Sequence, residues 1–294
     1  CSNGVTRINI SKKSLVKIEI PVPPLEVQRE IVSILDKFTE LEAELEAELE
    51  AELEARKSQY EHIREQLLEF GDDLSSHPMS ELIADLCPEG VPSASLPEVT
   101  EIVRGLTYSK ADEDPEGPVR VLRSNNINQS TNNLNMFDVK RLRKELVPNQ
   151  RTRIQRDDVL MSAASGSRSH VGKVAYVDKD PEAYFGGFMT TFRATEKVLP
   201  RFIFHVLTSH SFRDHLDLVL STSTINNINA SVLAGYVFRL PPLEIQREIV
   251  SILDKLEALV NDIVIGLPAE IAGRRKQYEH YRNKLLTFKG LEAA

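Results

Sequence analysis

One stretch of this sequence occurs twice, and the repetition constrains the fold more than any other feature. Residues 23–37 read PPLEVQREIVSILDK and residues 241–255 read PPLEIQREIVSILDK, with Val27 against Ile245 as the difference. The two copies lie 218 residues apart. The chain must therefore build the same local structure twice, on either side of a segment that is not repeated.

The offset of 218 residues holds beyond this opening. RKSQYEH at residues 56–62 corresponds to RRKQYEH at residues 274–280. An unchanged offset over more than forty residues means that no insertion separates the two copies. The repeats are therefore two units of equal length.

Each unit has the pattern of one long helix. The Pro-Pro pair disfavours helix before it, so a helix is expected to start near Leu25 and Glu26, where an acidic first turn suits the helix dipole. Apolar residues then recur at helical spacing as far as Leu67. Such a narrow apolar stripe needs a partner helix. In the second copy we expect a kink or weak turn at Gly266 and Pro268.

The middle of the first unit reads LEAELEAELEAELEA, with a period of four residues. Four residues advance a helix by about 6 Å and leave about 40° of net rotation. A base-pair step advances about 3.4 Å and turns roughly 35°. One four-residue repeat would thus re-aim an attached DNA reader by about one base-pair twist. The alternative interpretation is a solvated helix of low complexity.

Composition and charge limit the class of protein. The chain has 294 residues, of which 41% are hydrophobic, which is enough for one or two domains with a core. Cys1 and Cys87 cannot form a disulfide framework or a zinc cage. No apolar run has the length of a membrane span, and the start CSNGVTRINIS lacks a signal-peptide core. We predict a cytoplasmic protein with reduced thiols.

The net charge of −8 is unevenly distributed. Residues 91–238 carry 18 Lys or Arg against 16 Asp or Glu, a net charge of +2, which leaves a net charge of −10 for the rest. The acidic residues are thus concentrated in the repeats. Binding to phosphates depends on the local field, so nucleic acid remains a possible ligand of the unique segment. An average protein surface is the other interpretation.

The segment between the repeats, from about Ser80 to Leu240, predicts an α+β globular domain of roughly 160 residues. Its clear helix is PRFIFHVLTSHSFRDHLDLVL at residues 200–220, with proline near the first turn. Strand patterns occupy Val119–Arg123, Val159–Ser162, Val171–Val177, Phe188–Arg193 and Tyr236–Leu240.

Five loops of this segment are rich in groups that hydrogen-bond phosphates or base edges. They are RGLTYSK at 104–110, RSNNINQSTNN at 123–133, KRLRK at 140–144, SGSRSH at 165–170 and STSTINN at 221–227. Asn, Ser and Gly are also the usual residues of turns, and KRLRK is equally consistent with a solvated face.

Spacing excludes two other kinds of site. A phosphate-binding P-loop needs Gly, four residues, then Gly-Lys-Ser/Thr, but five residues follow Gly166 and Val174 stands where the hydroxyl belongs. His205, His210 and His215 recur every five residues, about 140° apart around a helix, so they cannot share a face as metal ligands. We predict no metal site.

No catalytic motif supports an enzyme. The sequence has no nucleophile elbow, HExxH, kinase set or glycine fingerprint after a strand. Asp157 and Asp158 open a strand without a clustered acidic or histidine partner. Scattered nuclease carboxylates would leave no motif, so an enzyme stays open as an alternative.

The two PPLExQREIVSILDK helix starts, their RK(S/K)QYEH continuations and the pieces RGLTYSK, RIQRDDVLMSAASGS, VGKVAYV and TSTINNINASVL cover nearly the whole chain. Together they resemble the DNA-specificity (S) subunit of Type I restriction–modification systems. The resemblance implies target-recognition domains that alternate with two conserved helical regions, which pair as an antiparallel coiled coil. It also implies that each recognition domain reads one half of a bipartite site, while the helices set the spacer and dock methyltransferase subunits.

The resemblance divides the chain into four parts. Residues 1–22 are the end of a first recognition domain, residues 23–72 the first long helix, residues 73–240 a complete recognition domain, and residues 241–294 the second long helix. INISKKSLVKIEIPVPPL in the first part parallels INASVLAGYVFRLPPL at the end of the complete domain. We expect a truncated, rearranged or split subunit, whose missing domain comes from another chain or from a homodimer.

This interpretation makes the chain a non-enzymatic recognition subunit for double-stranded DNA. We expect no cofactor in this chain, because S-adenosylmethionine is expected in the methyltransferase subunits. A restriction subunit is expected to bind through those methyltransferase subunits. Asn125, Asn126 and Arg168 are the first candidates for reading base edges. The predicted DNA-contacting residues are Arg104, Thr107, Tyr108, Lys110, Arg123, Ser124, Asn125, Asn126, Lys140, Arg141, Arg143, Ser165, Ser167, Arg168, Ser169, His170, Thr222 and Thr224. The predicted partner-binding helix positions are Leu25, Gln28, Ile31, Leu35, Leu243, Gln246, Ile249 and Leu253. The alternative is a coiled-coil scaffold that binds protein and not DNA.

Overall fold

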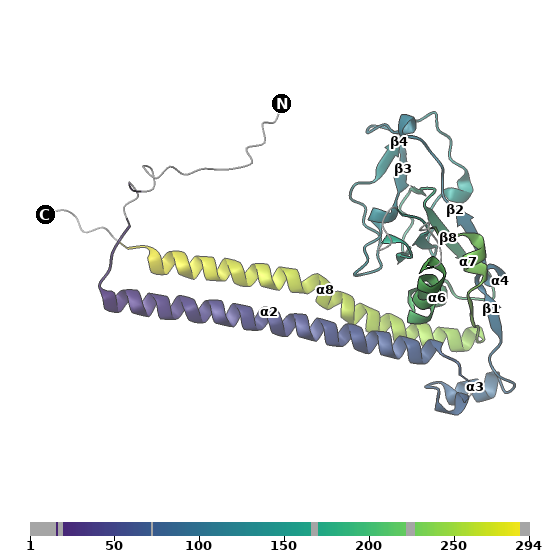
Figure 1. The fold of residues 1–294 in the computed structure, drawn as a ribbon, viewed down its shortest axis with the longest axis horizontal. Coiled ribbons are helices and arrows are strands. Elements are labelled where there is room, and N and C mark those ends of the chain that lie inside the picture. Colours follow the sequence, from purple (N-terminus) through teal and green to yellow (C-terminus); the bar gives the residue numbers. More distant parts are fainter. Residues whose placement is uncertain (1–15, 17–19, 72, 166–169, 222–226, 289–294) are drawn as a thin grey trace. The chain divides into compact units, whose positions relative to one another are not determined.

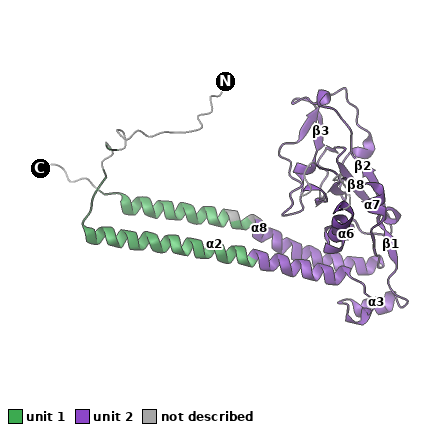
Figure 2. Cartoon of the chain, viewed as in Figure 1, with its two compact units in different colours: residues 1–52, 265–294 green, residues 53–264 purple. Residues whose placement is uncertain are grey.

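A computed structural model of the chain describes residues 16, 20–71, 73–165, 170–221 and 227–288 (Figure 1). Its contacts divide the chain into two compact units, residues 1–52 with 265–294 and residues 53–264 (Figure 2). The division cuts through both long helices, because the end of the first and the start of the second pack with the globular segment. The four-part division by resemblance stays a prediction.

The two repeats form two helices of equal length, α2 (Leu25–Leu68) and α8 (Leu243–Leu286), each of 44 residues. Both begin at the leucine after the Pro-Pro pair and carry a glutamate in the first turn, as predicted. α8 is one helix through Gly266 and Pro268, so no turn divides it, and the expected kink stays a prediction. Among the described residues, no helix combines the length and the hydropathy of a membrane span.

The two helices pair in an antiparallel way. In the first unit the ring of Phe38 stacks on that of Tyr281 at 5.6 Å, while Arg275 reaches Glu42 and Glu46 at 3.3 and 3.7 Å. Residue numbers therefore fall along α8 as they rise along α2. In the second unit the end of α2 and the start of α8 share one hydrophobic core. The predicted pairing is confirmed.

In the part of the chain that the structure describes, the globular segment contains three sheets and several short helices. Its elements are η1 (Leu74–Ser76), α3 (Ser80–Leu86), β1 (Ser93–Ser95), α4 (Leu96–Val99), β2 (Thr100–Arg104), η2 (Lys110–Asp112), β3 (Val119–Leu122), η3 (Ser124–Asn126), β4 (Lys140–Leu142), η4 (Gln150–Thr152), β5 (Val159–Ser162), β6 (Val174–Tyr176), β7 (Tyr184–Phe185), β8 (Met189–Ala194), α5 (Pro200–Thr208), α6 (His210–Ser221), α7 (Ala230–Ala234) and β9 (Val237–Arg239). The predicted α+β class is confirmed, and all five predicted strands occur, with ends shifted by at most three residues.

The central sheet has the order β2-β8-β5-β6 and is antiparallel throughout. A second sheet has the order β4-β3-β7, in which β3 and β7 are parallel, and β1 pairs with β9. Val159 and Met161 of β5 belong to the core that contains α5, whereas Leu160 faces a second core with Phe185 and Leu122. Side chains that alternate between two buried faces explain why β5 is hydrophobic at successive positions.

The predicted helix at residues 200–220 is wrong in one respect, because it consists of two helices that meet at Ser209. Ser209 has extended backbone angles, and its hydroxyl accepts from the Phe212 N–H at 3.2 Å, as an N-cap of α6 does. The Thr208 hydroxyl donates to the Phe204 carbonyl at 2.9 Å. Two adjacent hydroxyl side chains that compete for backbone groups end α5 here.

A buried polar network joins α5 to both long helices. Arg201 of α5 donates from Nε to Asp254 at 2.9 Å and also binds Glu257. His205, one turn further along α5, contacts Asp254 at 2.9 Å through Nε2 and the Tyr60 hydroxyl at 3.4 Å through Nδ1. Neutral His205 with its proton on Nε2 satisfies both contacts. Burial lowers the pKa of His205 to about 4.

This low pKa predicts an acid-sensitive junction. An unfolded histidine has a pKa near 6.5, so between about pH 6.5 and 4 the unfolded chain binds more protons and stability falls as pH falls. His205→Gln, which keeps a donor for Asp254 but does not titrate, should flatten the dependence of unfolding free energy on pH in this range. Urea denaturation from pH 7 to 4 measures it.

His62→Gln, which removes an exposed imidazole from α2, is the matched control. A slope that is unchanged in His205→Gln would assign the acid sensitivity to other groups.

Candidate nucleic-acid interface

A groove of about 660 Å³ opens beyond the ends of β2, β3 and β7. β2 ends at Arg104, η3 follows directly after β3, and the turn at residues 186–188 joins β7 to β8. The groove thus collects loops that are far apart in the sequence. Eight of the predicted DNA-contacting residues line it, namely Arg104, Thr107, Tyr108, Lys110, Arg123, Ser124, Asn125 and Lys140.

Close backbone packing holds these loops together. Gly105 donates to the Met189 carbonyl at 3.1 Å, and the Leu106 N–H donates to the Phe185 carbonyl at 2.7 Å. A Cβ on Gly105 would overlap the carbonyl of Gly186. Glycine is therefore required where RGLTYSK lies against the turn between β7 and β8.

The groove carries a positive local charge. Among the described residues, four basic side chains line it against one acidic side chain, that of Glu113. Lys140 pairs with Glu113 at 2.5 Å, and Arg123 Nη2 pairs with Asp138 at 2.9 Å. Arg104 Nε donates to the Gly187 carbonyl at 3.0 Å, which leaves the outer guanidinium nitrogens for another acceptor.

Asp138 orients two of these lining side chains. Its carboxylate accepts from Arg123, and also from Asn125 Nδ2 at 3.1 Å. Asp138 has φ 51°, a left-handed conformation that Asn and Asp tolerate better than most residues. The side chains of Arg123 and Asn125 are therefore placed before any ligand arrives.

Asn126 does not reach the groove, contrary to prediction. Its side chain is fully buried, and Nδ2 donates to the carbonyls of Asn135 and Phe137 at 2.9 and 2.8 Å. Its Oδ1 accepts from the Arg123 N–H at 2.8 Å. With these hydrogen bonds Asn126 holds the loop at residues 127–139, whereas Asn125 lines the groove.

Tyr108 lies at the wall of the groove. Partial burial is the largest effect on its hydroxyl and raises the pKa of Tyr108. The phenol is therefore protonated at neutral pH and can both donate and accept a hydrogen bond.

The other predicted contacts lie elsewhere. Arg141 donates from Nε to the Gly117 carbonyl at 2.8 Å, and Arg143 pairs with Asp112 at 2.6 Å, so both are engaged outside the groove. Ser165 and the exposed His170 are described but do not line it. Five further predictions, Ser167, Arg168, Ser169, Thr222 and Thr224, lie outside the described residues.

Sequence reasoning missed the turn at residues 186–188, Gly-Gly-Phe, which forms one wall of the groove. Phe188 was assigned to a strand, yet its side chain is 70% exposed. Two glycines directly before an aromatic residue are a signal of a tight turn that could have been used.

The carboxylates that the sequence singled out have structural partners. Asp158 is buried and accepts from Arg193 Nε at 2.9 Å and Nη2 at 3.2 Å. Asp157 accepts from the Tyr176 hydroxyl at 2.5 Å. Neither lines the groove.

His205, Asp254 and Glu257 offer ligand atoms that all lie within 4.8 Å of one another. Arg201 binds both carboxylates, so its guanidinium already supplies the positive charge that a metal ion would bring. Asp254 and Glu257 are therefore partners of the Arg201 guanidinium in an ion pair.

The predicted partner-binding helix positions fall into two groups. Gln246, Ile249 and Leu253 are fully buried under the globular segment, and Ile31 is buried as well, so, contrary to the prediction that they bind a partner subunit, these side chains are not accessible to one. Leu25, Gln28, Leu35 and Leu243 remain at least partly exposed.

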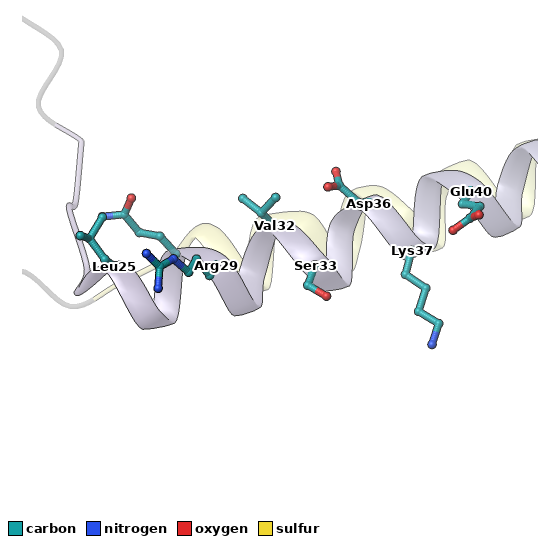
Figure 3. A pocket seen from close by; sticks show the side chains of 8 residues that line it. Leu25, Arg29, Val32, Ser33, Asp36, Lys37 and Glu40 are labelled. Atoms are coloured by element: carbon teal, nitrogen blue, oxygen red, sulfur yellow. The ribbon is translucent and has the colours of Figure 1, made fainter.

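A shallow surface groove runs along the start of α2 (Figure 3). Leu25 and Val32, 67% and 54% exposed, are the apolar residues of this face, and Asp36 lies one turn beyond Val32. An exposed face of this kind on a long helix is typical of a surface that binds another element.

The comparisons with known proteins agree with one another. The sequence matches the family described as Type I restriction modification DNA specificity domain over residues 1–55 and 88–272. It is 30% identical over 294 residues to the specificity subunit of the Type I restriction enzyme EcoR124I/EcoR124II of Escherichia coli, with 95% of this chain and 65% of that protein covered. The chain thus spans just under two thirds of that relative's length.

Solved structures share the fold. A chain from a study of complex assembly and conformational transition in the type I R-M system matches with a TM-score of 0.69 at 20% identity, over 96% of this chain and 65% of that one. The crystal structure of the HsdS subunit from Thermoanaerobacter tengcongensis matches with a TM-score of 0.55 at 19% identity, over 97% and 64%. The family match covers most of the chain, including most of both repeated helices and the segment that forms the groove. The chain therefore belongs to the Type I restriction modification DNA specificity domain family.

Proposed function

We propose that this chain recognises one half of a bipartite double-stranded DNA site for a Type I restriction–modification system. The observation that carries the proposal is the groove, where eight polar or basic loop residues predicted from sequence come together. Family membership supports the same role. Methylation and cleavage would be carried out by partner subunits, and S-adenosylmethionine would bind to the methyltransferase.

Within the groove the side chains divide by chemistry. Arg104, Lys110 and Lys140 would contact phosphates, which positions the domain but carries no sequence information. Asn125 would read a base edge, since a carboxamide matches adenine N6 and N7 in the major groove. Arg123 matches guanine O6 and N7, provided that it leaves Asp138.

The internal repeat also supports the proposal that a second recognition domain packs on the exposed face of α2. Gln28 Nε2 donates to the Pro23 carbonyl at 2.7 Å, and its repeat counterpart Gln246 donates to the Pro241 carbonyl at 2.7 Å. Gln246 makes a further bond, because its Oε1 accepts from the Leu199 N–H at 2.9 Å at the start of α5. The same glutamine geometry thus occurs once under a recognition domain and once on an exposed face.

Other side chains repeat in the same way. Asp254, which binds Arg201, corresponds to Asp36, an exposed residue of α2. The Arg64 guanidinium lies 5.0 Å from the ring of Tyr60, and the counterpart pair Arg282 and Tyr278 lies at 5.7 Å. The first unit therefore offers the acidic, amide and aromatic groups that hold α5 in the second unit. A second domain there would read the other half of the site, supplied by additional residues of this chain or by another chain.

Methyltransferase subunits would bind the remaining outward faces of the paired helices. α2 is rich in glutamate in its middle, so this surface repels DNA and is free for protein. A homodimer is an alternative source of the second recognition domain.

The DNA proposal makes a prediction about two groove residues. Lys110→Ala should weaken binding to all duplexes alike and lower the salt slope, log K against log salt, by about 1. Asn125→Ala should cost about 1–3 kcal/mol at one base position and leave the slope nearly unchanged. Fluorescence anisotropy over randomised duplexes at two salt concentrations, with the methyltransferase subunit present, measures both.

Lys179→Ala, an exposed lysine outside the groove, controls for charge as such. Wild-type binding without sequence preference or salt dependence would favour the scaffold alternative.

The repeat makes a second prediction. Replacing residues 1–22 by a further copy of residues 73–240 gives a tandem chain, because residues 23–37 and 241–255 provide the same junction. The added domain should protect the amides of residues 25–40 from hydrogen exchange. In the tandem chain Gln28→Ala and Asp36→Ala should each reduce this protection and lower the melting temperature of the added domain.

Glu30→Ala, an exposed residue of α2 that does not line the surface groove, is the control in the tandem chain. Exchange rates at residues 25–40 that do not respond to the added domain would assign this face to the methyltransferase instead.

A further inference from the structure

Phe188 combines a fixed backbone with a solvent-exposed ring. Its carbonyl accepts from the N–H groups of Ala163 and Ala164 at 2.8 and 3.0 Å. On one side Gly187 is held by Arg104 at 3.0 Å, and on the other Met189 donates to the Gly186 carbonyl at 2.8 Å. The ring nevertheless is 70% exposed, while Met189 and Phe185 are fully buried.

This exposure is unfavourable for folding alone. A phenyl ring in water forgoes the hydrophobic free energy that burial would supply. A flexible loop could turn such a ring inward, but the hydrogen bonds on both sides of Phe188 prevent this. The backbone of this turn therefore keeps the ring at the surface.

Phe188 also lies where the polar loops of the domain meet. It lines the groove with residues of RGLTYSK and with Arg123 and Asn125. Ala163 and Ala164, which bind its carbonyl, precede Ser165, and Ala164 forms a bridge with Asn227. Ala164, directly before the SGSRSH loop, thus contacts both Phe188 and Asn227, the last residue of the STSTINN segment.

The surroundings indicate nucleic acid as the ligand of this ring. A protein partner needs a contiguous apolar patch, whereas Phe188 is surrounded by Arg104, Thr107 and Lys110 at the lining of the groove. Leu106 and Met189 also line the groove, but Met189 is fully buried and Leu106 partly buried, so Phe188 is the strongly exposed apolar side chain among the described lining residues. An exposed apolar group among hydrogen-bonding groups matches the major-groove edge of a thymine, where the C5-methyl group adjoins the O4 acceptor.

We propose that Phe188 contacts the C5-methyl group of a thymine in the recognised half-site, so that it is a specificity-determining residue. This inference rests on the proposed function in DNA recognition. It adds a hydrophobic contact to the hydrogen-bonding and ionic contacts that the other groove residues would make.

The test removes the methyl group from the DNA and the ring from the protein. The preferred duplex is selected from random sequences with the full chain and its methyltransferase partner, and each thymine is then replaced by deoxyuridine. For wild-type protein one such replacement should weaken binding roughly four-fold, the effect of exposing one methyl group. Phe188→Ala should weaken binding to the thymine duplex and show no further loss with deoxyuridine at that position.

Two further variants sharpen the result. Phe188→Leu should keep a measurable preference for thymine over deoxyuridine, because it remains apolar. Val147→Ala removes another exposed apolar side chain, 86% exposed and outside the groove, and should keep the wild-type ratio. Circular dichroism melting checks that each variant is folded.

Failure of this inference is distinguishable from failure of the proposed function. A wild-type complex that prefers one sequence yet tolerates deoxyuridine everywhere, or whose preferred site lacks thymine, would overturn the Phe188 contact alone. Loss of methyltransferase binding in Phe188→Ala, with thymine discrimination retained, would make the ring a protein contact and overturn it too. A wild-type complex without any sequence preference would overturn both proposals.

Discussion

The ionic contact between Arg201 and the carboxylates of Asp254 and Glu257 supports the rest of the second unit. It fixes α5 on the first half of α8, and α5 in turn covers one face of the central sheet through Phe202 and Phe204. Loops that form the groove adjoin strands of this sheet, since β2 ends at Arg104 and β8 begins at Met189. A charged pair that is partly buried tolerates few other geometries, because an unpaired charge there would be poorly solvated. The orientation of the groove relative to α8 thus depends on this contact.

The groove shows why net charge is a poor guide for this chain. The molecule is acidic as a whole, yet its acidic residues are concentrated in α2, and the described lining of the groove has four basic residues and one acidic residue. Several of these cations already have partners, such as Lys140 with Glu113 and Arg123 with Asp138. These ion pairs keep the side chains in place, and a phosphate or base bound as proposed would exchange with the carboxylates.

The repeat places nearly identical residues in two different environments. Gln246 is buried and binds the chain before α5, whereas Gln28 keeps the bond to its own Pro-Pro turn and has an exposed neighbour, Val32. Local sequence accounts for the bond that both glutamines share. Burial depends on whether a globular domain lies over the helix, and this is a matter of tertiary structure.

The sequence by itself determined the two helices from Leu25 and Leu243, the presence of the five predicted strands and two loops that line the groove, RGLTYSK and the start of RSNNINQSTNN. These features depend on periodicity, proline and local composition, which are readable along the chain. Only the tertiary structure decided that Asn125 lines the groove while Asn126 is buried, and that the ring of Phe188 is exposed. Two adjacent asparagines have the same chemistry, so their roles are set by which one meets the carbonyls of Asn135 and Phe137. Such contacts join residues distant in sequence or on opposite sides of a turn, and no local pattern encodes them.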